Sequence, residues 1–403
     1  MRPELTLILL FTVATAVAIA TQRLGIPYTV ALVLAGLGLG AAHVSGGAHL
    51  TKDLLFAVFL PGLIFEASYH LKFTDFRKNA RAILALAVPG VAAAIGATAF
   101  VLVATDQAFK TKLDLSHALV FSALIAATDP IAVVALFKTV GAPKRLGVLI
   151  EGESLINDGT AVVLFTIIFA AVSGEGITVA AGALEFFRVV GLGFLVGALF
   201  GVGGSLVLKR TSDPMIEITV STLVAYGSFA VGEEAHVSGV IATVTAGMFF
   251  GSWGAVKEMT RASRVVVESF WEYIAFAFNS IVFLLIGLAV PIRQLLQSWR
   301  PILLAFFAVT VGRAVVVAAA TLLLRPSAER IPWRYSVVLT WGGLRGALSM
   351  VLALAIPESF PSRDLIVSMT FGVVLLSIVV QGATTGPLLK WLGLSGHGSA
   401  VVE

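Results

Sequence analysis

The sequence predicts an all-α polytopic membrane protein with about 13 transmembrane helices. Hydrophobic residues make up 58% of the 403 residues and charged residues only 12%, about half the charged share of a soluble domain. Apolar runs recur at the spacing of a membrane helix plus its loop, which is about 30 residues. The basic residues lie in the loops between these runs, so we expect contact with the lipid bilayer and no binding of nucleic acid.

We expect one transmembrane helix in each of the apolar ranges of the chain. The first range lacks the basic segment and cleavage site of a signal peptide, so we interpret it as a helix. Without cysteine, the chain can form neither disulfides nor cysteine metal sites. The ranges lie at about 5–20, 27–45, 53–70, 82–104, 116–138, 147–172, 186–208, 214–232, 237–252, 270–290, 301–324, 334–356 and 364–390.

The distribution of Lys and Arg predicts the orientation of the chain. Of the 27 basic residues, 17 lie in loops on one side of the predicted membrane and 8 on the other. Because cytoplasmic loops are enriched in Lys and Arg, we expect an outside N-terminus and a cytoplasmic C-terminus in a cell membrane. The remaining two, Arg313 and Arg345, fall inside predicted helices.

Two groups of three helices have the same pattern and indicate an inverted repeat. Each group opens and closes with a long apolar helix, and its middle helix is interrupted, by Thr128 to Pro130 in one and by Gly342 to Gly346 in the other. The groups are seven helices apart and therefore enter the membrane from opposite sides. Such paired interruptions are typical of transporters with a site near the middle of the membrane.

The first interruption supplies oxygen ligands for a cation. Pro130 removes a backbone donor and opens the helix around Thr128 and Asp129, which frees carbonyl groups beside the Thr hydroxyl. The alternative is an ordinary proline kink capped by a threonine. An acid facing lipid is costly, and Asp129, Glu153 and Asp158 together would cost roughly 8 to 10 kcal/mol, so we expect them to face a polar site.

The next predicted helix carries two polar pairs at helical spacing. Ser154 and Asp158 are four residues apart on one face, and Glu153 and Asn157 form a pair on an adjoining face. The alternative for Glu151 and Glu153 is that they stabilise the start of the helix, where negative charge is favoured. A buried carboxylate at Asp158 that binds a proton or a cation, but not both, would couple the two flows.

Other polar residues inside predicted helices have more than one interpretation. Arg345 either compensates the acids or fixes the interrupted helix as a structural charge. We expect Glu66 to pair with Arg313 as a structural ion pair, because each needs a partner in the membrane. Asn279 is interpreted as a polar residue in helix packing rather than a ligand.

These residues resemble the signature of a known family. The runs from Ala127 to Val133 and from Glu151 to Ala161 are similar to motifs of the monovalent cation/proton antiporters, with further matches from Leu60 to Glu66 and from Gly342 to Gly346. This family includes bacterial and archaeal sodium/proton antiporters, animal sodium/proton exchangers and plant plasma-membrane sodium exchangers. The resemblance covers essentially the whole chain.

The resemblance implies a division of the chain into two domains and a short tail. A six-helix core, in which the two interrupted helices cross, would move like an elevator against a domain that forms a homodimer. The implied segments are 1–81 and 173–300 for the dimerisation domain, 82–172 and 301–391 for the core, and 392–403 for a cytoplasmic tail.

The family's site residues carry over to matching positions. The resemblance implies that the backbone of Thr128, with Asp129, Glu153, Ser154 and Asp158, surrounds the cation, and that Asp158 alternates between cation and proton. In the family, Asn157 before Asp158 is associated with electroneutral exchange. Glu66 and Arg313 match a buried ion pair, with Pro130 and Arg345 in supporting roles. Animal exchangers carry an acid at the position of Asn279, so the chain looks prokaryotic or plant-like.

The implied activity is exchange of Na⁺ or Li⁺ for H⁺, with a role in pH homeostasis and sodium tolerance and no cofactor. One alternative is K⁺/H⁺ exchange, because the sequence does not give the dimensions of the site. A second alternative is a cation channel or a proton-conducting subunit, although channels usually need rings of ligands along a continuous pore. The motifs of hydrolases and phosphate-binding enzymes are absent, so we expect no enzymatic activity.

Overall fold

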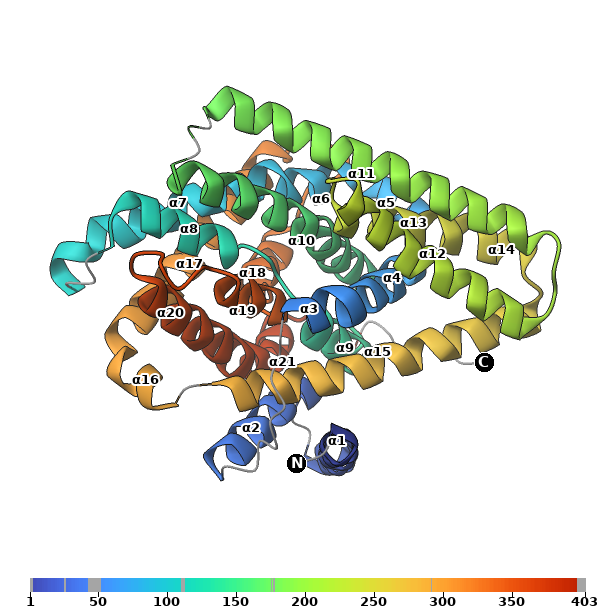
Figure 1. Cartoon of the computed structure of the whole chain (residues 1–403), viewed down its shortest axis with the longest axis horizontal. Coiled ribbons are helices and arrows are strands. Elements are labelled where there is room, and N and C mark those ends of the chain that lie inside the picture. Colours follow the sequence, from blue (N-terminus) through green and yellow to red (C-terminus); the bar gives the residue numbers. More distant parts are fainter. Residues whose placement is uncertain are drawn as a thin grey trace.

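The computed structural model describes residues 3–24, 27–42, 52–109, 113–174, 176, 178–290 and 292–396. All regular secondary structure in these ranges is helical (Figure 1), which confirms the all-α prediction. The end of the predicted range 27–45 and residues 397–403 of the predicted tail lie outside the described ranges.

The helices follow one another with short connections. The first half of the chain forms α1 (Pro3–Leu24), α2 (Tyr28–Ala41), α3 (Lys52–Leu54), the π-helix η1 (Leu55–Phe59), α4 (Leu60–His70), α5 (Phe73–Lys78), α6 (Ala80–Ala87), α7 (Pro89–Phe109), α8 (Leu115–Leu124), α9 (Ile131–Val140) and α10 (Lys144–Val172). The second half forms α11 (Val179–Leu208), α12 (Pro214–Glu234), α13 (Gly239–Phe249), η2 (Phe250–Ala255), α14 (Val256–Glu258), α15 (Arg261–Ala289), α16 (Ile292–Gln297), α17 (Trp299–Leu323), α18 (Trp333–Trp341), α19 (Ala347–Leu354), α20 (Arg363–Leu376), η3 (Ser377–Gly382) and α21 (Ala383–Trp391).

The lengths and composition of these helices fit a multi-pass membrane protein. Among the described residues, eight helical segments are long and apolar enough to cross a membrane, and five shorter helices are also apolar. Every range predicted from the sequence contains helix. Both predicted interruptions are confirmed, because six residues separate the end of α8 from the start of α9 at Ile131, and α18 ends at Trp341 before α19 begins at Ala347.

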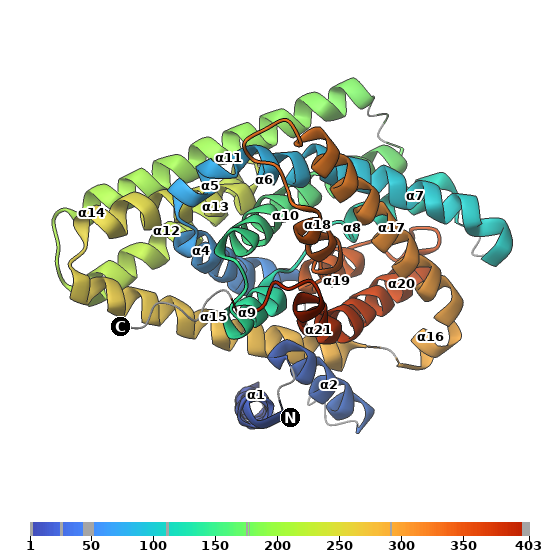
Figure 2. The same cartoon turned by 180° about the vertical axis from the view of Figure 1, so that it is seen from behind.

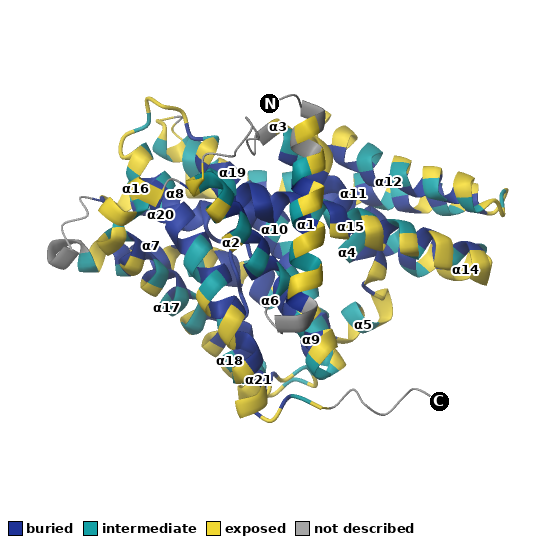
Figure 3. Cartoon of the chain, turned by 90° about the horizontal axis from the view of Figure 1, so that it is seen from below, coloured by how far each residue is buried: buried dark blue, intermediate teal, exposed yellow. Residues whose placement is uncertain are grey.

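Two sets of helices each pack closely, and they also contact each other where α10 meets α11 and α13. In one group, α7 lies along α17, and α8 packs against both α7 and α10. In the other, α15 packs along α2, and α11 along α13. Figures 1 and 2 show α8, α10, α18 and α19 in the middle, with α11 and α15 along opposite edges. Buried residues gather around the central helices, whereas α1 and α14 expose many residues (Figure 3).

The contact between α2 and α15 depends on glycine at two facing positions. A Cβ atom at Gly36 would collide with the backbone oxygen of Leu284, and one at Gly287 would collide with the backbone oxygen of Val33. The two backbones therefore approach more closely than side chains would allow, as small residues permit in membrane helices.

We expect Gly36→Ala to destabilise the protein by about 1–3 kcal/mol, because a methyl group there overpacks the contact between α2 and α15. The control is Gly38→Ala on the same helix, where no atom lies within 4 Å of the new Cβ. Thermal melting in detergent measures both. Equal melting temperatures for the two variants would show that the close contact contributes little.

Candidate functional site

The two interruptions meet in the middle of the molecule. The backbone N–H of Asp129 donates to the carbonyl of Leu344 at 2.8 Å. A Cβ at Gly346 would lie 2.6 Å from Oδ2 of Asp129, so this approach requires glycine. The opened segment between α8 and α9 is thus held directly against the one between α18 and α19.

Charged side chains match the helix ends that the interruptions create. The Asp129 carboxylate accepts a hydrogen bond from the backbone N–H of Ile131, the first residue of α9, at 3.0 Å. Arg345 lies beyond the C-terminus of α8, where its Nη1 donates to the carbonyls of Ala126 (2.7 Å) and Ala127 (3.1 Å). Negative charge at a helix N-terminus and positive charge at a C-terminus are both favourable.

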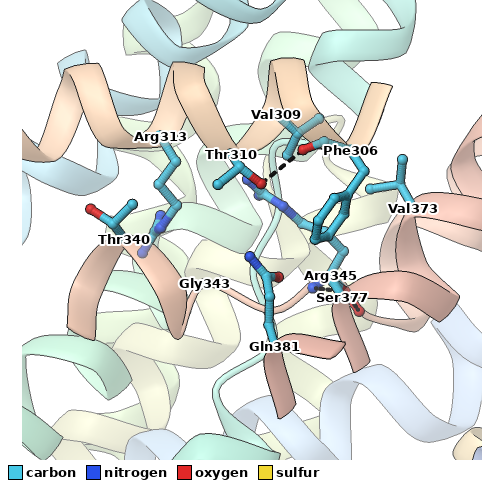
Figure 4. A pocket seen from close by; sticks show the side chains of 10 residues that line it. All are labelled: Phe306, Val309, Thr310, Arg313, Thr340, Gly343, Arg345, Val373, Ser377 and Gln381. Atoms are coloured by element: carbon cyan, nitrogen blue, oxygen red, sulfur yellow. Dashed lines mark hydrogen bonds between the residues drawn. The ribbon is translucent and has the colours of Figure 1, made fainter. Parts of the chain in front are cut away.

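Both interpretations of Arg345, compensation of the acids and a structural charge, stay predictions, and its two hydrogen bonds are contacts that a structural charge would form. Its side chain is buried and forms no salt bridge with the described residues. Figure 4 shows Arg345 in a small cavity that Arg313 and Gln381 also line, with its backbone N–H donating to Ser377 Oγ at 3.0 Å.

A buried hydrogen-bond network joins the first interruption to α10. Thr128 Oγ1 and Ser154 Oγ are 2.9 Å apart. Nδ2 of Asn157 lies within hydrogen-bond distance of Thr128 Oγ1 (3.0 Å), Glu153 Oε1 (3.2 Å) and the carbonyl of Ala126 (3.3 Å). This network fixes the opened backbone relative to the polar face of α10.

Asp158 lies one turn beyond Ser154 and lines a cavity of about 100 Å³. Its carboxylate forms no hydrogen bond or ion pair with the described part of the chain. A buried water needs only about 10–15 Å³ of such space, so the cavity can hold a cation with water. Its polar lining consists of Glu66, Thr128, Asp129, Ser154, Asp158 and Asn279.

Glu153 lies outside this cavity lining. Both of its carboxylate oxygens pair with Arg313 of α17, at 3.0 Å from Nη1 and 2.9 Å from Nη2. Gly343 of the second interruption packs directly on this guanidinium, since a Cβ there would collide with it. Glu153 is thus engaged with Arg313, and its contact with the cation stays a prediction.

The predicted pair of Glu66 with Arg313 is wrong. Glu66 instead pairs with His70, one turn later on α4, at 3.2 Å. The reason lies in the packing, because α17 contacts α7, α18 and α20, whereas α4 contacts α13, α15 and α12. Arg313 thus meets the acid on α10 and never reaches α4.

The capping interpretation of Glu151 and Glu153 is also wrong. The helix α10 begins at Lys144, so these acids lie about two turns beyond its start, where the favourable field of the N-terminus has fallen off. The predicted range 147–172 starts three residues too late, because α10 already begins at Lys144.

Comparison with known proteins shows to which family the chain belongs. The model of the family described as "Sodium/hydrogen exchanger, transmembrane" matches residues 8–391. The chain belongs to this family. As a member of the sodium/hydrogen exchangers, it resembles the Na⁺/H⁺ antiporter ApNhaP of Aphanothece halophytica, with 38% identity over 386 residues that cover 95% of this chain and 73% of that protein.

A second relative supports the family assignment, and a solved structure shows the fold. The Na⁺/H⁺ antiporter NhaH of Halobacillus dabanensis is 34% identical over 403 residues, which cover 96% of this chain and 97% of that protein. The structure of the sodium proton antiporter MjNhaP1 from Methanocaldococcus jannaschii has a TM-score of 0.78 at 18% identity and covers 98% of this chain and 100% of that one. The similarity to this solved structure shows the fold of the chain.

The exchanger site contains a residue that the sequence did not assign to it. Asn279 of α15 lines the same cavity as Asp158, and its Oδ1 is buried with no hydrogen-bond partner among the described residues. Its interpretation as a packing residue therefore understates its position. The signal was available, because animal exchangers carry an acid at the matching position.

We expect Arg313→Met to destabilise the protein by about 3–5 kcal/mol, because it leaves the buried Glu153 carboxylate without its partner. The double variant Arg313→Met with Glu153→Gln removes the stranded charge and should recover much of this loss. Thermal melting of the single and double variants measures the difference. If the double variant melted no higher than Arg313→Met alone, the ion pair would not be the cause.

Proposed function

We propose that this exchanger is a secondary antiporter that exchanges Na⁺ or Li⁺ for H⁺ across a cell membrane and has no enzymatic activity. The proposal is supported by family membership and by the relatives that are named as Na⁺/H⁺ antiporters. A role in pH homeostasis and sodium tolerance would follow from this exchange.

One observation carries the proposal. The Asp158 carboxylate lies without a partner in a cavity that also contains the opened backbone and Asp129. A lone carboxylate enclosed in a membrane protein takes up a counter-ion, and a proton and an alkali cation compete for it. This competition couples the movement of one ion to that of the other.

The cation would bind among oxygen atoms, which hard cations prefer. We propose as ligands the backbone carbonyl of Thr128 and the side chains of Asp129, Ser154 and Asp158. Glu153 supports these ligands from outside, because its carboxylate orients Asn157 while paired with Arg313. Pro130 keeps the segment open, and Arg345 holds the carbonyls before Thr128.

We propose alternating access by an elevator movement. The core, residues 82–172 and 301–391, carries Asp158 and both interruptions. It would move against residues 1–81 and 173–300, which form the homodimer contact. The separate packing of α7 with α17 and of α2 with α15 supports this division. The inverted repeat, 13 spans, an outside N-terminus and a cytoplasmic C-terminus are parts of the same proposal.

The exchange would be electroneutral, with one Na⁺ for one H⁺. Asn157 is neutral and its amide is engaged with Thr128 and Glu153, and the Glu153 charge is balanced by Arg313. K⁺ is the alternative substrate. A channel is a less suitable alternative, because the cavity is a single cluster of ligands between two interrupted helices rather than a series of rings.

We expect Asp158→Asn to abolish cation-driven H⁺ flux in proteoliposomes, because an amide neither binds a proton nor balances the cation. The control is Asp364→Asn, whose side chain is fully exposed. Flux is measured by a pH dye after addition of Na⁺, Li⁺ or K⁺ in parallel. Exchange that persists in folded Asp158→Asn would refute the site, and the ranking of the three ions decides the substrate.

We expect the Na⁺-driven flux to be independent of membrane potential if the exchange is one for one. An imposed potential of 100 mV acts on each net charge with about 2.3 kcal/mol, so an electrogenic exchanger would change its rate by a large factor. The measurement compares the flux in proteoliposomes with and without a K⁺ diffusion potential. The same comparison is made with the Asn157→Asp variant. A strong effect of potential on the unmodified protein would contradict the stoichiometry.

A further inference from the structure

A second and larger cavity, of about 800 Å³, lies away from Asp158. It forms where the end of α4 and the start of α5 meet η2, α14 and the first turns of α15. The residues that matter for its chemistry are Tyr69, Lys72, Phe73, Trp253, Lys257 and Arg264. Nothing in the exchange mechanism uses this cavity.

The cavity has an excess of positive charge. Lys72, Lys257 and Arg264 line it together with one acid, Glu268. Arg264 is engaged, since its Nη2 donates to the carbonyls of Ala255 (2.6 Å) and Val256 (2.9 Å). Neither lysine forms a salt bridge with any residue that the structure describes.

The other acids nearby already have partners. Asp75 of α5 accepts a hydrogen bond from Lys144 Nζ at 2.6 Å, and this bond holds the pKa of Asp75 below its usual value. Glu258 of α14 lies 3.8 Å from Lys209. Lys72 and Lys257 therefore form no salt bridge with these acids, and their ammonium groups can bind an anionic ligand.

The walls of the cavity are apolar and partly exposed. Phe73, Trp253 and Val256 are 44%, 51% and 58% exposed, and Lys257 Nζ lies 5.4 Å from the centre of the Trp253 ring. Tryptophan beside a basic residue is typical of the membrane–water interface. A lipid molecule at this interface has an apolar end and a charged end. These walls would gain nothing from a small hydrophilic anion.

We propose that this cavity binds an anionic phospholipid. Lys72 and Lys257 bind the phosphate, and the acyl chains lie along Phe73, Trp253 and Val256. Clusters of basic residues beside membrane helices attract anionic headgroups in this way. The volume and the apolar walls favour a whole lipid over free phosphate.

The position of the two lysines gives the lipid a structural consequence. Lys72 and Phe73 begin the connection from α4 to α6, whereas Lys257 belongs to α14. The N–H of Phe73 donates to Ser252 Oγ of η2, which precedes α14, at 2.9 Å. A bound lipid adds a second bridge. This inference does not rest on the proposed function, because binding can be measured without transport.

The test measures binding of phosphatidylglycerol to the purified full chain by native mass spectrometry and by the shift in melting temperature. We expect the double variant Lys72→Gln with Lys257→Gln to bind phosphatidylglycerol about tenfold more weakly, because two phosphate contacts are lost. The control double variant, Arg325→Gln with Lys390→Gln, removes two exposed basic residues elsewhere and should bind normally. Val256→Glu, which adds a negative charge to an exposed wall, should weaken binding as well.

Two further ligands distinguish the source of the phosphate. Phosphatidylcholine, which is zwitterionic, and inorganic phosphate should each give little binding or stabilisation. Equal binding of phosphatidylglycerol to the lysine variant and to the control variant would overturn the proposal. The proposal would also be overturned if inorganic phosphate alone stabilised the protein as much as phosphatidylglycerol does. Loss of transport in Asp158→Asn leaves both outcomes unaffected, so the two proposals fail separately.

Discussion

The structure of this exchanger depends on the crossing of two interrupted helices. Inside a membrane, backbone groups released from a helix have no water to bind, so each needs a partner from the protein. Here the N–H of Asp129 bonds to the carbonyl of Leu344, and Arg345 holds the carbonyls of Ala126 and Ala127. Each interrupted segment thus supplies hydrogen-bond partners for backbone groups of the other. Two openings that would be unstable alone form a rigid polar centre together.

This mutual support explains how a carboxylate can lie without a partner in the apolar interior. The oxygen atoms around Asp158 are fixed in advance by Thr128, Ser154 and the amide of Asn157, and the charge of Glu153 is already neutralised by Arg313. On the proposed function, little reorganisation would be needed when a cation enters. Asp158 and Asp129 line the cavity without a cationic partner among the described residues, so the proposed exchange would supply their counter-ions from outside.

The parts of this arrangement that follow from local chemistry were predictable. Hydropathy located the helices, and Pro130 and the glycines from Gly342 located both interruptions, because these residues act on their own backbone. The pairing of Glu66 with Arg313 was wrong because a sequence shows which charges need partners but not which helices face one another. The position of Asn279 was underestimated for the same reason, since α15 comes from the other group of helices.

A single short helix, α4, contributes to the walls of both cavities. Glu66 of α4 lines the cavity of Asp158, while Tyr69 and His70 of the same helix line the proposed lipid cavity. His70 also pairs with Glu66, so a displacement at the end of α4 reaches the wall of the ion cavity within one turn. Because α4 is followed directly by α5 and α6, a lipid that bridges Lys72 and Lys257 would restrain both the wall and the connection. The proposed lipid would therefore act on the proposed exchange through α4.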